Sequence, residues 1–239
     1  MKYMGSKRRI AKHILPIMVG VAQERGVTKW VEPFVGGGNM IDKVPPSFER
    51  IGYDLNDHAI MAMIDIRDRA ADLPDSVTEQ EYNDMKGLPA ASVTSWVRFA
   101  CAYAGIFESK LASGGENKDG TPRNYAAEAK RNAIKQQPSI QGVQFTHGCY
   151  QDLDVTNALI YCDPPYANTA GYKTGDFDSE AFFSWCRVQA AKGNIVFVSE
   201  YNAPADFICL WQGEIKTNFA SSRTEATHNA VERLFMVVA

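Results

Sequence analysis

The sequence predicts an α/β fold in which a sheet domain is interrupted by a mostly helical insert. At both ends of the chain, short apolar runs with the length of buried strands alternate with segments whose apolar residues have helical spacing. Between residues 72 and 140 the pattern changes, and the expected elements there are helices. We therefore expect residues 1–71 and 141–239 to form the sheet domain and residues 72–140 to form the insert.

Each expected element follows from a local pattern. Helices are expected where apolar residues recur at every third or fourth position, at 8–23, 57–71, 79–86, 93–107, 125–136 and 179–192. Strands are expected at short apolar runs, at 30–35, 50–55, 143–147, 159–162, 194–199, 207–211 and 234–238. A loop rich in glycine and charge is expected over residues 113–122.

Composition is that of an ordinary globular protein. The 239 residues are 45% hydrophobic and 22% charged, which is enough to bury one good core. No apolar stretch approaches the ~20 residues of a membrane span, and Lys12, His13 and Pro16 interrupt the first helix, which argues against a signal peptide. The five cysteines form no C-x-x-C pair, which favours reduced thiols in a cytoplasm and argues against a zinc site.

Charge is distributed unevenly along the chain, although the net charge is only −3. The first twelve residues carry five basic side chains and no acid, and residues 98–138 hold seven basic side chains against four acidic ones. Local positive potential is sufficient for a protein that binds nucleic acid, so an acidic total does not exclude it. Solvated helix faces remain an equal alternative for residues 98–138.

The most informative segment is Asp163-Pro164-Pro165-Tyr166, which directly follows the expected strand 159–162. Two consecutive prolines fix the backbone and supply no N–H donors, so the turn is stiff and its carbonyls are unpaired. A carboxylate, free carbonyls and a flat aromatic face suit the amine edge of a planar base. The alternative is a proline turn with an exposed acid.

A second candidate site begins with Gly36-Gly37-Gly38, which closes the strand expected at 30–35. Glycines let a ligand approach the backbone closely, but the pattern is neither G-x-G-x-x-G nor a P-loop. Asp54 follows eighteen residues after Gly36 and ends the next strand, which suits a carboxylate that accepts the two ribose hydroxyls of an adenosine. The alternative is a structural glycine turn with a turn aspartate.

These motifs, in this order, resemble the Dam-like DNA adenine-N6 methyltransferases of phage and prophage type. The resemblance rests on residues 3–7, 32–39, 52–56 and 163–166, and extends into the insert at 99–105 and 123–128. It implies a Rossmann-like class I methyltransferase sheet with a target-recognition insert. It also implies transfer of a methyl group from S-adenosylmethionine to N6 of a flipped-out adenine in double-stranded DNA, by a cytoplasmic protein. We expect a monomer by default.

The resemblance implies cofactor contacts, with Lys7 near the cofactor carboxylate and Asp54 on the ribose. The residues expected around the cofactor are Tyr3, Lys7, Phe34, Gly36, Gly37, Gly38, Asp54, Asp152 and Asp163. For Asp152 the alternative is a plain turn acid, and for Lys7 it is a surface charge.

The resemblance also implies that Asp163, Pro164 and Tyr166 hold and stack the target base, although Tyr166 could instead be a core aromatic. No metal is expected. The basic side chains of the insert are expected to contact DNA, mostly at phosphates, namely Arg98, Lys110, Lys118, Arg123, Lys130 and Arg131.

Two other functions were weighed. A methyltransferase acting on cytosine N4 or on protein glutamine tends to carry serine or asparagine where Asp163 stands, and both lack this insert. A decoy that binds cofactor and DNA without turnover would keep Asp54 and lose Asp163. The sequence leaves open the recognised DNA site and the biological role, which includes restriction-modification, host evasion and regulation.

Overall fold

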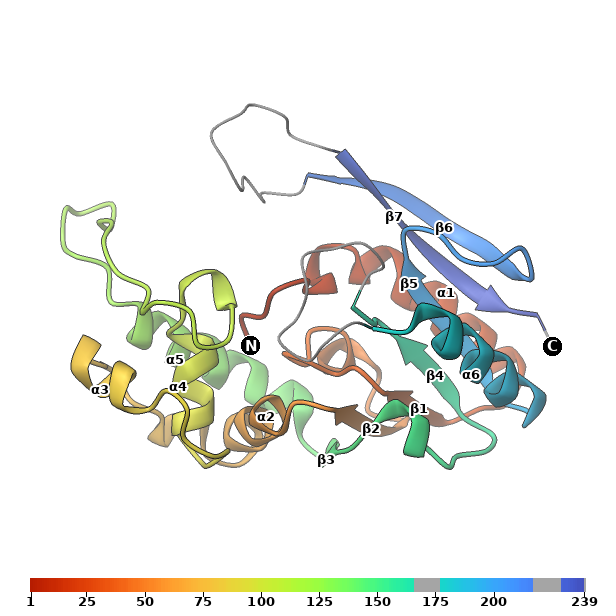
Figure 1. Ribbon diagram of the computed structural model, residues 1–239, viewed down its shortest axis with the longest axis horizontal. Helices are drawn as coiled ribbons and strands as arrows, with labels where there is room; N and C mark the ends of the chain where they lie inside the picture. Colours follow the sequence, from red (N-terminus) through yellow and green to blue (C-terminus); the bar gives the residue numbers. More distant parts are fainter. Residues whose placement is uncertain (166–176, 217–228, 239) are drawn as a thin grey trace.

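The computed structural model describes residues 1–165, 177–216 and 229–238. A seven-stranded sheet with the order β3-β2-β1-β4-β5-β7-β6 forms its centre (Figure 1). The strands are β1 Lys29–Glu32, β2 Glu49–Asp54, β3 Gln144–His147, β4 Leu159–Cys162, β5 Ile195–Glu200, β6 Phe207–Lys216 and β7 Asn229–Val237. Strands β1 to β5 run parallel, and β7 runs antiparallel to both β5 and β6. The predicted α/β sheet is confirmed.

Several of the helices begin at residues whose side chains cap the first turn. Asn56, Asn124 and Asp178 accept backbone N–H bonds at the starts of α2, α5 and α6, as helix N-cap residues do. The α-helices are α1 Ala11–Glu24, α2 Asp57–Arg69, α3 Glu79–Asp84, α4 Thr94–Ala100, α5 Tyr125–Gln136 and α6 Ser179–Ala191. In the described ranges, no helix combines the length and the apolar character that crossing a membrane requires.

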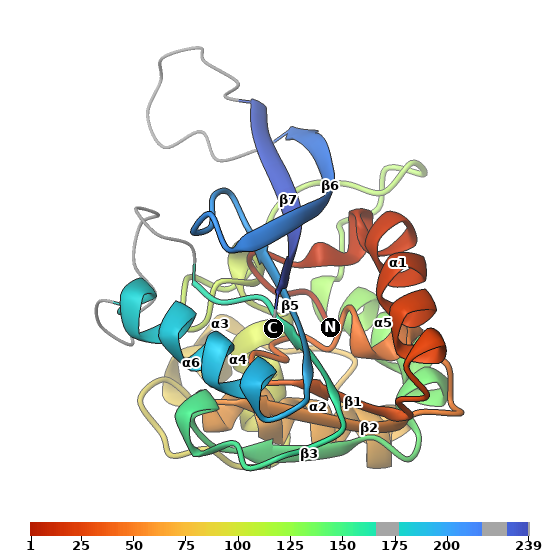
Figure 2. The same cartoon turned by 90° about the vertical axis from the view of Figure 1, so that its right-hand side faces the viewer.

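Helices cover both faces of the sheet, with α1 on one side and α6 on the other (Figure 2). Alternation along the strands produces this arrangement, because successive side chains point to opposite faces. On β4, Leu159 and Tyr161 join the core that contains α1 and α2, whereas Ile160 and Cys162 join the core beneath α6. The central strands are therefore buried on both faces, as parallel strands usually are.

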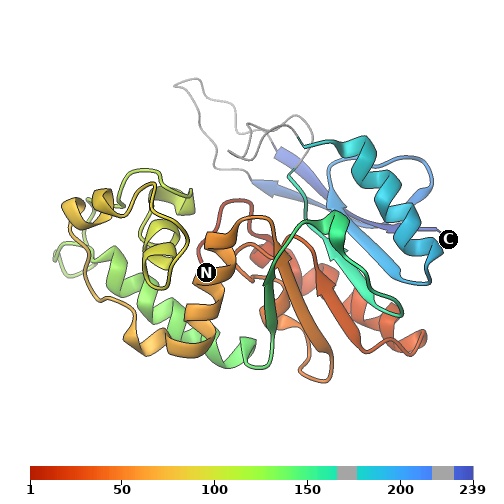
Figure 3. The same ribbon diagram turned by 60° about the horizontal axis from the view of Figure 1, so that its bottom comes forward.

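The helices of the expected insert, α3 to α5, lie together beside α2 (Figures 1 and 3). Trp96 and Phe99 of α4 belong to the same hydrophobic core as Met63 of α2. The buried carboxylate of Asp65 accepts hydrogen bonds from Ser92 Oγ and from the backbone N–H of Val93. These bonds fix the start of α4, where Val93 has a φ of 65° that is costly for a β-branched residue. The insert thus shares its core with the sheet domain.

The predicted helix over 93–107 is wrong beyond Ala100. Ala104 and Gly105 have φ values of 58° and 72°, which an α-helix does not allow, and Ala102 instead forms a bridge to Leu111. Strands β6 and β7 are longer than predicted because they pair with each other along almost their whole length. Polar residues in these two strands give no apolar signal. The predicted end of β6 was therefore too early in the chain, and the predicted start of β7 was too late.

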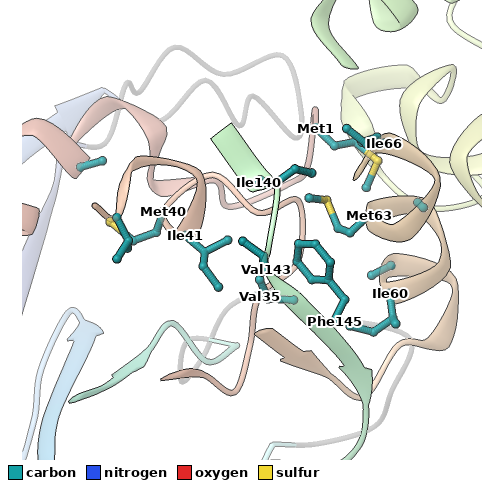
Figure 4. Close-up of a cluster of buried hydrophobic side chains, with 14 of the residues drawn as sticks. Met1, Val35, Met40, Ile41, Ile60, Met63, Ile66, Ile140, Val143 and Phe145 are labelled. Atoms are coloured by element: carbon teal, nitrogen blue, oxygen red, sulfur yellow. The ribbon is translucent and has the colours of Figure 1, made fainter. Parts of the chain in front are cut away.

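One buried hydrophobic cluster brings Met1 together with the segment between α5 and β3, which follows the insert (Figure 4). Met1 packs near Met63 of α2, and Ile140, Val143 and Phe145 close the same cluster on the side of β3. These side chains are all buried, with at most 8% of their surface exposed. The first residues of the chain are thereby held against the sheet domain.

Candidate functional site

Three carboxyl groups lie where neighbouring parallel strands end. Glu32 ends β1 and Asp54 ends β2, while Asp163 follows the last residue of β4. Strand β1 lies between β2 and β4, and the strand order reverses between β1 and β4. In open α/β sheets, ligands bind outside the carboxyl ends of the strands at such a reversal. The arrangement therefore brings both sequence-predicted motifs to one edge of the sheet.

Asp54 ties the end of β2 to the glycine turn after β1. Its Oδ2 accepts a hydrogen bond from Gly36 N at 2.8 Å, and its Oδ1 accepts one from Asn56 N at 2.9 Å. Burial raises the pKa of Asp54 to about 6, although the two backbone N–H groups oppose this shift. The carboxylate is thus fixed in orientation, and lone pairs remain on both oxygens for hydroxyl donors.

The glycines of the turn are required by packing within the protein. A Cβ on Gly36 would lie 2.9 Å from the Tyr3 ring, and a Cβ on Gly38 would lie 2.5 Å from the Met63 methyl group. Both glycines also have positive φ values, of 48° and 65°. The predicted reason for the glycines was close approach of a ligand. The structure adds that they let Tyr3 cover the turn.

A side chain from the insert donates hydrogen bonds to the same glycine turn. Nε2 of the buried Gln136, the last residue of α5, donates to the carbonyls of Gly37 and Gly38 at 3.1 and 3.2 Å. It also lies 3.1 Å from Oδ2 of Asp42. Buried carbonyls without partners are costly, so Gln136 stabilises this conformation of the turn. The insert therefore contributes directly to the shape of the candidate cofactor site.

Apolar and aromatic groups surround Asp54. Leu55 follows it and is 56% exposed, which is unusual for a large aliphatic side chain next to a buried strand. Phe34 packs against Tyr150, with ring centroids 5.4 Å apart, and Tyr150 begins the short 3-10 helix that ends at Asp152. This helix follows β3, and Gly148 N donates to the Asp54 carbonyl at 3.1 Å. The exposed Asp152 is thus close in the fold to the end of β2.

Asp163 is paired with a buried lysine. Lys7 Nζ lies 2.8 Å from Asp163 Oδ1, and it also donates to the Gly5 carbonyl at 3.1 Å. Lys7 is only 8% exposed, so the alternative that it is a surface charge is wrong. Burial lowers the pKa of Lys7, but the nearby carboxylates of Asp163 and Glu232 raise it by more, so that the net shift is upward. The Lys7 ammonium thus lies beside Asp163, and its expected contact with the cofactor carboxylate stays a prediction.

The residues after Asp163 are described only in part. Pro164, the residue after Asp163, is buried. Tyr166, the predicted stacking residue, lies outside the described residues. Between Asp54 and Asp163, the buried carboxyl of Glu32 accepts a hydrogen bond from Trp30 Nε1 at 2.9 Å. Burial raises the pKa of Glu32 well above its ordinary range, which favours its neutral form.

The basic side chains predicted to contact DNA fall into three groups. Arg98 is 2% exposed, pairs with Glu108, donates to the Leu88 carbonyl and stacks on Phe107. The prediction for Arg98 as a DNA contact is wrong for this structure, because a buried guanidinium with these partners cannot reach a phosphate. Sequence reasoning missed this because the charge was read without its partner, Glu108, ten residues away.

The other five basic side chains remain available at or near the surface. Arg123 pairs with Glu128 and Lys130 pairs with Asp75, at 2.7 and 2.9 Å. Lys110, Lys118 and Arg131 are exposed, and none of them forms an ion pair within the described ranges. Lys110 Nζ lies 4.9 Å from the ring centroid of Tyr103, which is itself 55% exposed. Tyr103 is a surface aromatic that sequence reasoning did not select.

Comparison with known proteins assigns the chain to a family. Residues 3–187 match the model of the D12 class N6 adenine-specific DNA methyltransferases. Because the match covers well over half of the chain, the protein belongs to this family of enzymes, and the predicted resemblance to DNA adenine-N6 methyltransferases is confirmed. A search of curated proteins gives no match.

A solved structure is also similar to this chain. It is the crystal structure of SMU.472, a protein provisionally described as a methyltransferase and complexed with SAH. The TM-score is 0.32 at 12% sequence identity, and the similarity covers 88% of this chain and 48% of that chain. This chain therefore spans about half the length of that structure.

Proposed function

We propose that the protein transfers a methyl group from S-adenosylmethionine to N6 of adenine in double-stranded DNA. The observation that carries this proposal is the shared edge of the sheet. At this edge, Asp54 ends β2 and has a carboxylate suited to a ribose, and Asp163 follows the end of β4. Strands β2 and β4 are the two neighbours of β1 in the sheet. Membership of the N6 adenine-specific DNA methyltransferase family supports the same reaction.

The residues around Asp54 fit the cofactor. Lone pairs on the fixed carboxylate of Asp54 accept the two ribose hydroxyls, and the exposed Leu55 gives the adenine ring an apolar surface. Asp152, which is exposed at the end of the short 3-10 helix after β3, is the residue proposed to accept the adenine amino group. Tyr3, which covers the glycine turn, and Phe34, which precedes it, line the methionine part in this proposal.

The residues at the end of β4 fit the target base. When bound, S-adenosylmethionine would supply an electrophilic methyl group; its transfer to the N6 lone pair would leave the electron pair of the broken C–S bond on sulfur, and the alkylated amine would release one proton to solvent. Asp163 and the Pro164 carbonyl accept the two N–H groups of adenine N6, which draws the nitrogen towards tetrahedral geometry. The negative charge on Asp163 stabilises the positive charge that develops on this amine. Alignment of the two reactants supplies much of the rate.

The insert is the proposed DNA-recognition element. The base must leave the duplex to reach Asp163, and Tyr166 is the residue proposed to stack on it. Lys110, Lys118 and Arg131 are exposed cations that suit phosphates, and the exposed ring of Tyr103 suits contact with a base. We propose a cytoplasmic enzyme that acts as a monomer, in a restriction-modification or phage setting.

The test is methylation of plasmid DNA from a strain without adenine methylation. The purified protein is incubated with this DNA and S-adenosylmethionine, and modified bases are mapped by single-molecule sequencing, with Asp163→Ala as the matched inactive variant. N6-methyladenine in one short motif, absent with Asp163→Ala, is the expected result. Methylation of cytosine, or no methylation by a protein that binds the cofactor, would contradict the proposal.

A further inference from the structure

Lys7 lies between two carboxylates rather than beside one. Its Nζ is 2.8 Å from Asp163 Oδ1 and 3.8 Å from Glu232 Oε1. The side chain of Glu232 is only 4% exposed. A buried carboxylate is costly unless a cation balances it, and the Lys7 ammonium lies close enough to stabilise both acids.

The direction of β7 explains how Glu232 reaches this position. Because β7 runs antiparallel to β5, its first residues lie at the edge where the parallel strands end, and Arg233 pairs in register with Glu200, the last residue of β5. Glu232 shares a face of β7 with Leu234, which belongs to the core containing α1. This is the face towards the N-terminal segment, which carries Lys7.

Charge competition follows from the proposed function. Asp163 must offer an oxygen to the adenine amine, but its Oδ1 already faces the Lys7 ammonium. A lysine with no other anion nearby would be drawn entirely onto Asp163. Glu232 supplies the second anion, and both carboxylates contribute to the raised pKa of Lys7.

We propose that Glu232 is a positioning residue for methyl transfer, which shares the Lys7 ammonium with Asp163 so that the lysine is not drawn entirely onto the carboxylate that must face the base. This inference rests on the proposed function. Taken by themselves, Lys7, Asp163 and Glu232 carry one positive and two negative charges, a net charge of −1. That charge complements the positive sulfonium of the methyl donor.

The first test compares Glu232→Gln with Glu214→Gln, which removes a carboxylate from the exposed face of the adjacent strand β6. We expect Glu232→Gln to lower the single-turnover methylation rate about tenfold, a barrier change of about 1.4 kcal/mol, while the cofactor Kd and the Tm change little. Glu214→Gln should match the wild type in all three. A Glu232→Gln rate equal to the wild type would overturn the proposal, as would an equal loss in both variants.

A double-mutant cycle tests whether Glu232 acts through Lys7. In a Lys7→Met background, the proposed route from Glu232 through Lys7 to Asp163 is absent, so adding Glu232→Gln should not lower the rate further. Independent, multiplicative losses from the two substitutions would overturn the proposal.

A measurement without turnover separates this inference from the proposed function. The Lys7 ammonium is observed by 1H–15N NMR and assigned by its loss in Lys7→Met, and Glu232→Gln should lower its pKa. Among the described residues, Asp163 and Tyr201 are the other titratable groups that act on Lys7, and both remain in this variant. An unchanged Lys7 pKa would overturn the inference, whereas an inactive wild type would count against the proposed function alone.

Discussion

The carboxyl ends of β2 and β4 each present an aspartate, but the protein holds the two in different ways. Asp54 accepts two backbone N–H groups, from Gly36 and Asn56, and Asp163 is paired with the Lys7 ammonium. Backbone donors fix the direction of a carboxylate without adding a full positive charge, and burial therefore still raises the pKa of Asp54 to about 6. A lysine adds a full charge, which favours the ionised form of its partner.

The difference suits the two proposed tasks. A carboxylate that accepts ribose hydroxyls has to be oriented, and neutral donors are sufficient for that purpose. A carboxylate that stabilises charge developing on an amine has to be ionised when the reaction occurs. The protein therefore supplies the second aspartate with a buried cation from the N-terminal segment and the first with the backbone of a turn.

The largest effect should follow from Asp163→Asn, which keeps the shape of the side chain and removes its charge. We expect the methylation rate to fall by about a thousandfold or more, the scale for loss of a charged group at the reacting centre, and the cofactor Kd to stay within about threefold. Single-turnover assays and calorimetry measure the two quantities. A rate within tenfold of the wild type would show that the charge on Asp163 is not what drives transfer.

Asp54→Asn should have the next largest effect, which we expect on the cofactor Kd and not on the methylation rate. An amide offers one oxygen where the carboxylate accepts from Gly36 N and Asn56 N with both, so the turn loses a bond and the ribose loses an acceptor. We expect the cofactor Kd to rise about thirtyfold, or about 2 kcal/mol. Asp57→Asn, at an exposed neighbouring carboxylate, is the control and should bind as the wild type does.

The pH dependence of cofactor binding should show a smaller effect from the same residue. With a pKa of about 6, Asp54 loses its proton between pH 5 and 7, and its ionised form is the better acceptor for hydroxyls. Affinity should therefore rise by about tenfold over this interval and then level off. The rise should be absent in Asp54→Asn, and a flat profile in the wild type would contradict the assignment.

The sign for stability is opposite. The folded pKa of Asp54 lies above its ordinary value of 3.8, so the folded state binds more protons than the unfolded state between pH 4 and 6. The contribution of this group to the free energy of unfolding should therefore decrease as pH rises through that range. Urea denaturation of the wild type and Asp54→Asn, compared at both ends of the range, measures it.

The smallest effects should come from the insert, where the same contrast between paired and unpaired charges recurs. Lys118 is exposed and has no ion pair in the part of the chain that the structure describes, whereas Lys130 pairs with Asp75. Lys118→Ala should reduce the slope of log Kd against log salt by about one, with a loss of DNA affinity of a few fold. Lys130→Ala should change the slope less, because Lys130 must first leave Asp75. Equal slopes in all three proteins would show that neither lysine contacts a phosphate.

The sequence by itself determined the α/β class, most of the elements and the position of both aspartates. These features are local. An apolar run predicts a strand, and a turn motif that follows it must lie at the carboxyl end of that strand, so parallel pairing alone brings Asp54 and Asp163 to one edge. The motif order was also sufficient to predict the family, which the match over residues 3–187 confirms.

Only the tertiary structure decided which groups satisfy those aspartates and the turn between them. Lys7 meets Asp163 and Glu232 across most of the chain, and Gln136 reaches the Gly37 and Gly38 carbonyls from the insert. The sequence around Lys7 and around Gln136 gives no sign that these side chains are buried, because burial is predicted from the spacing of apolar residues and not from single polar ones. Their partners were fixed by how β7, α5 and the N-terminal segment pack together, and the requirement to satisfy buried polar groups then determined which contacts form.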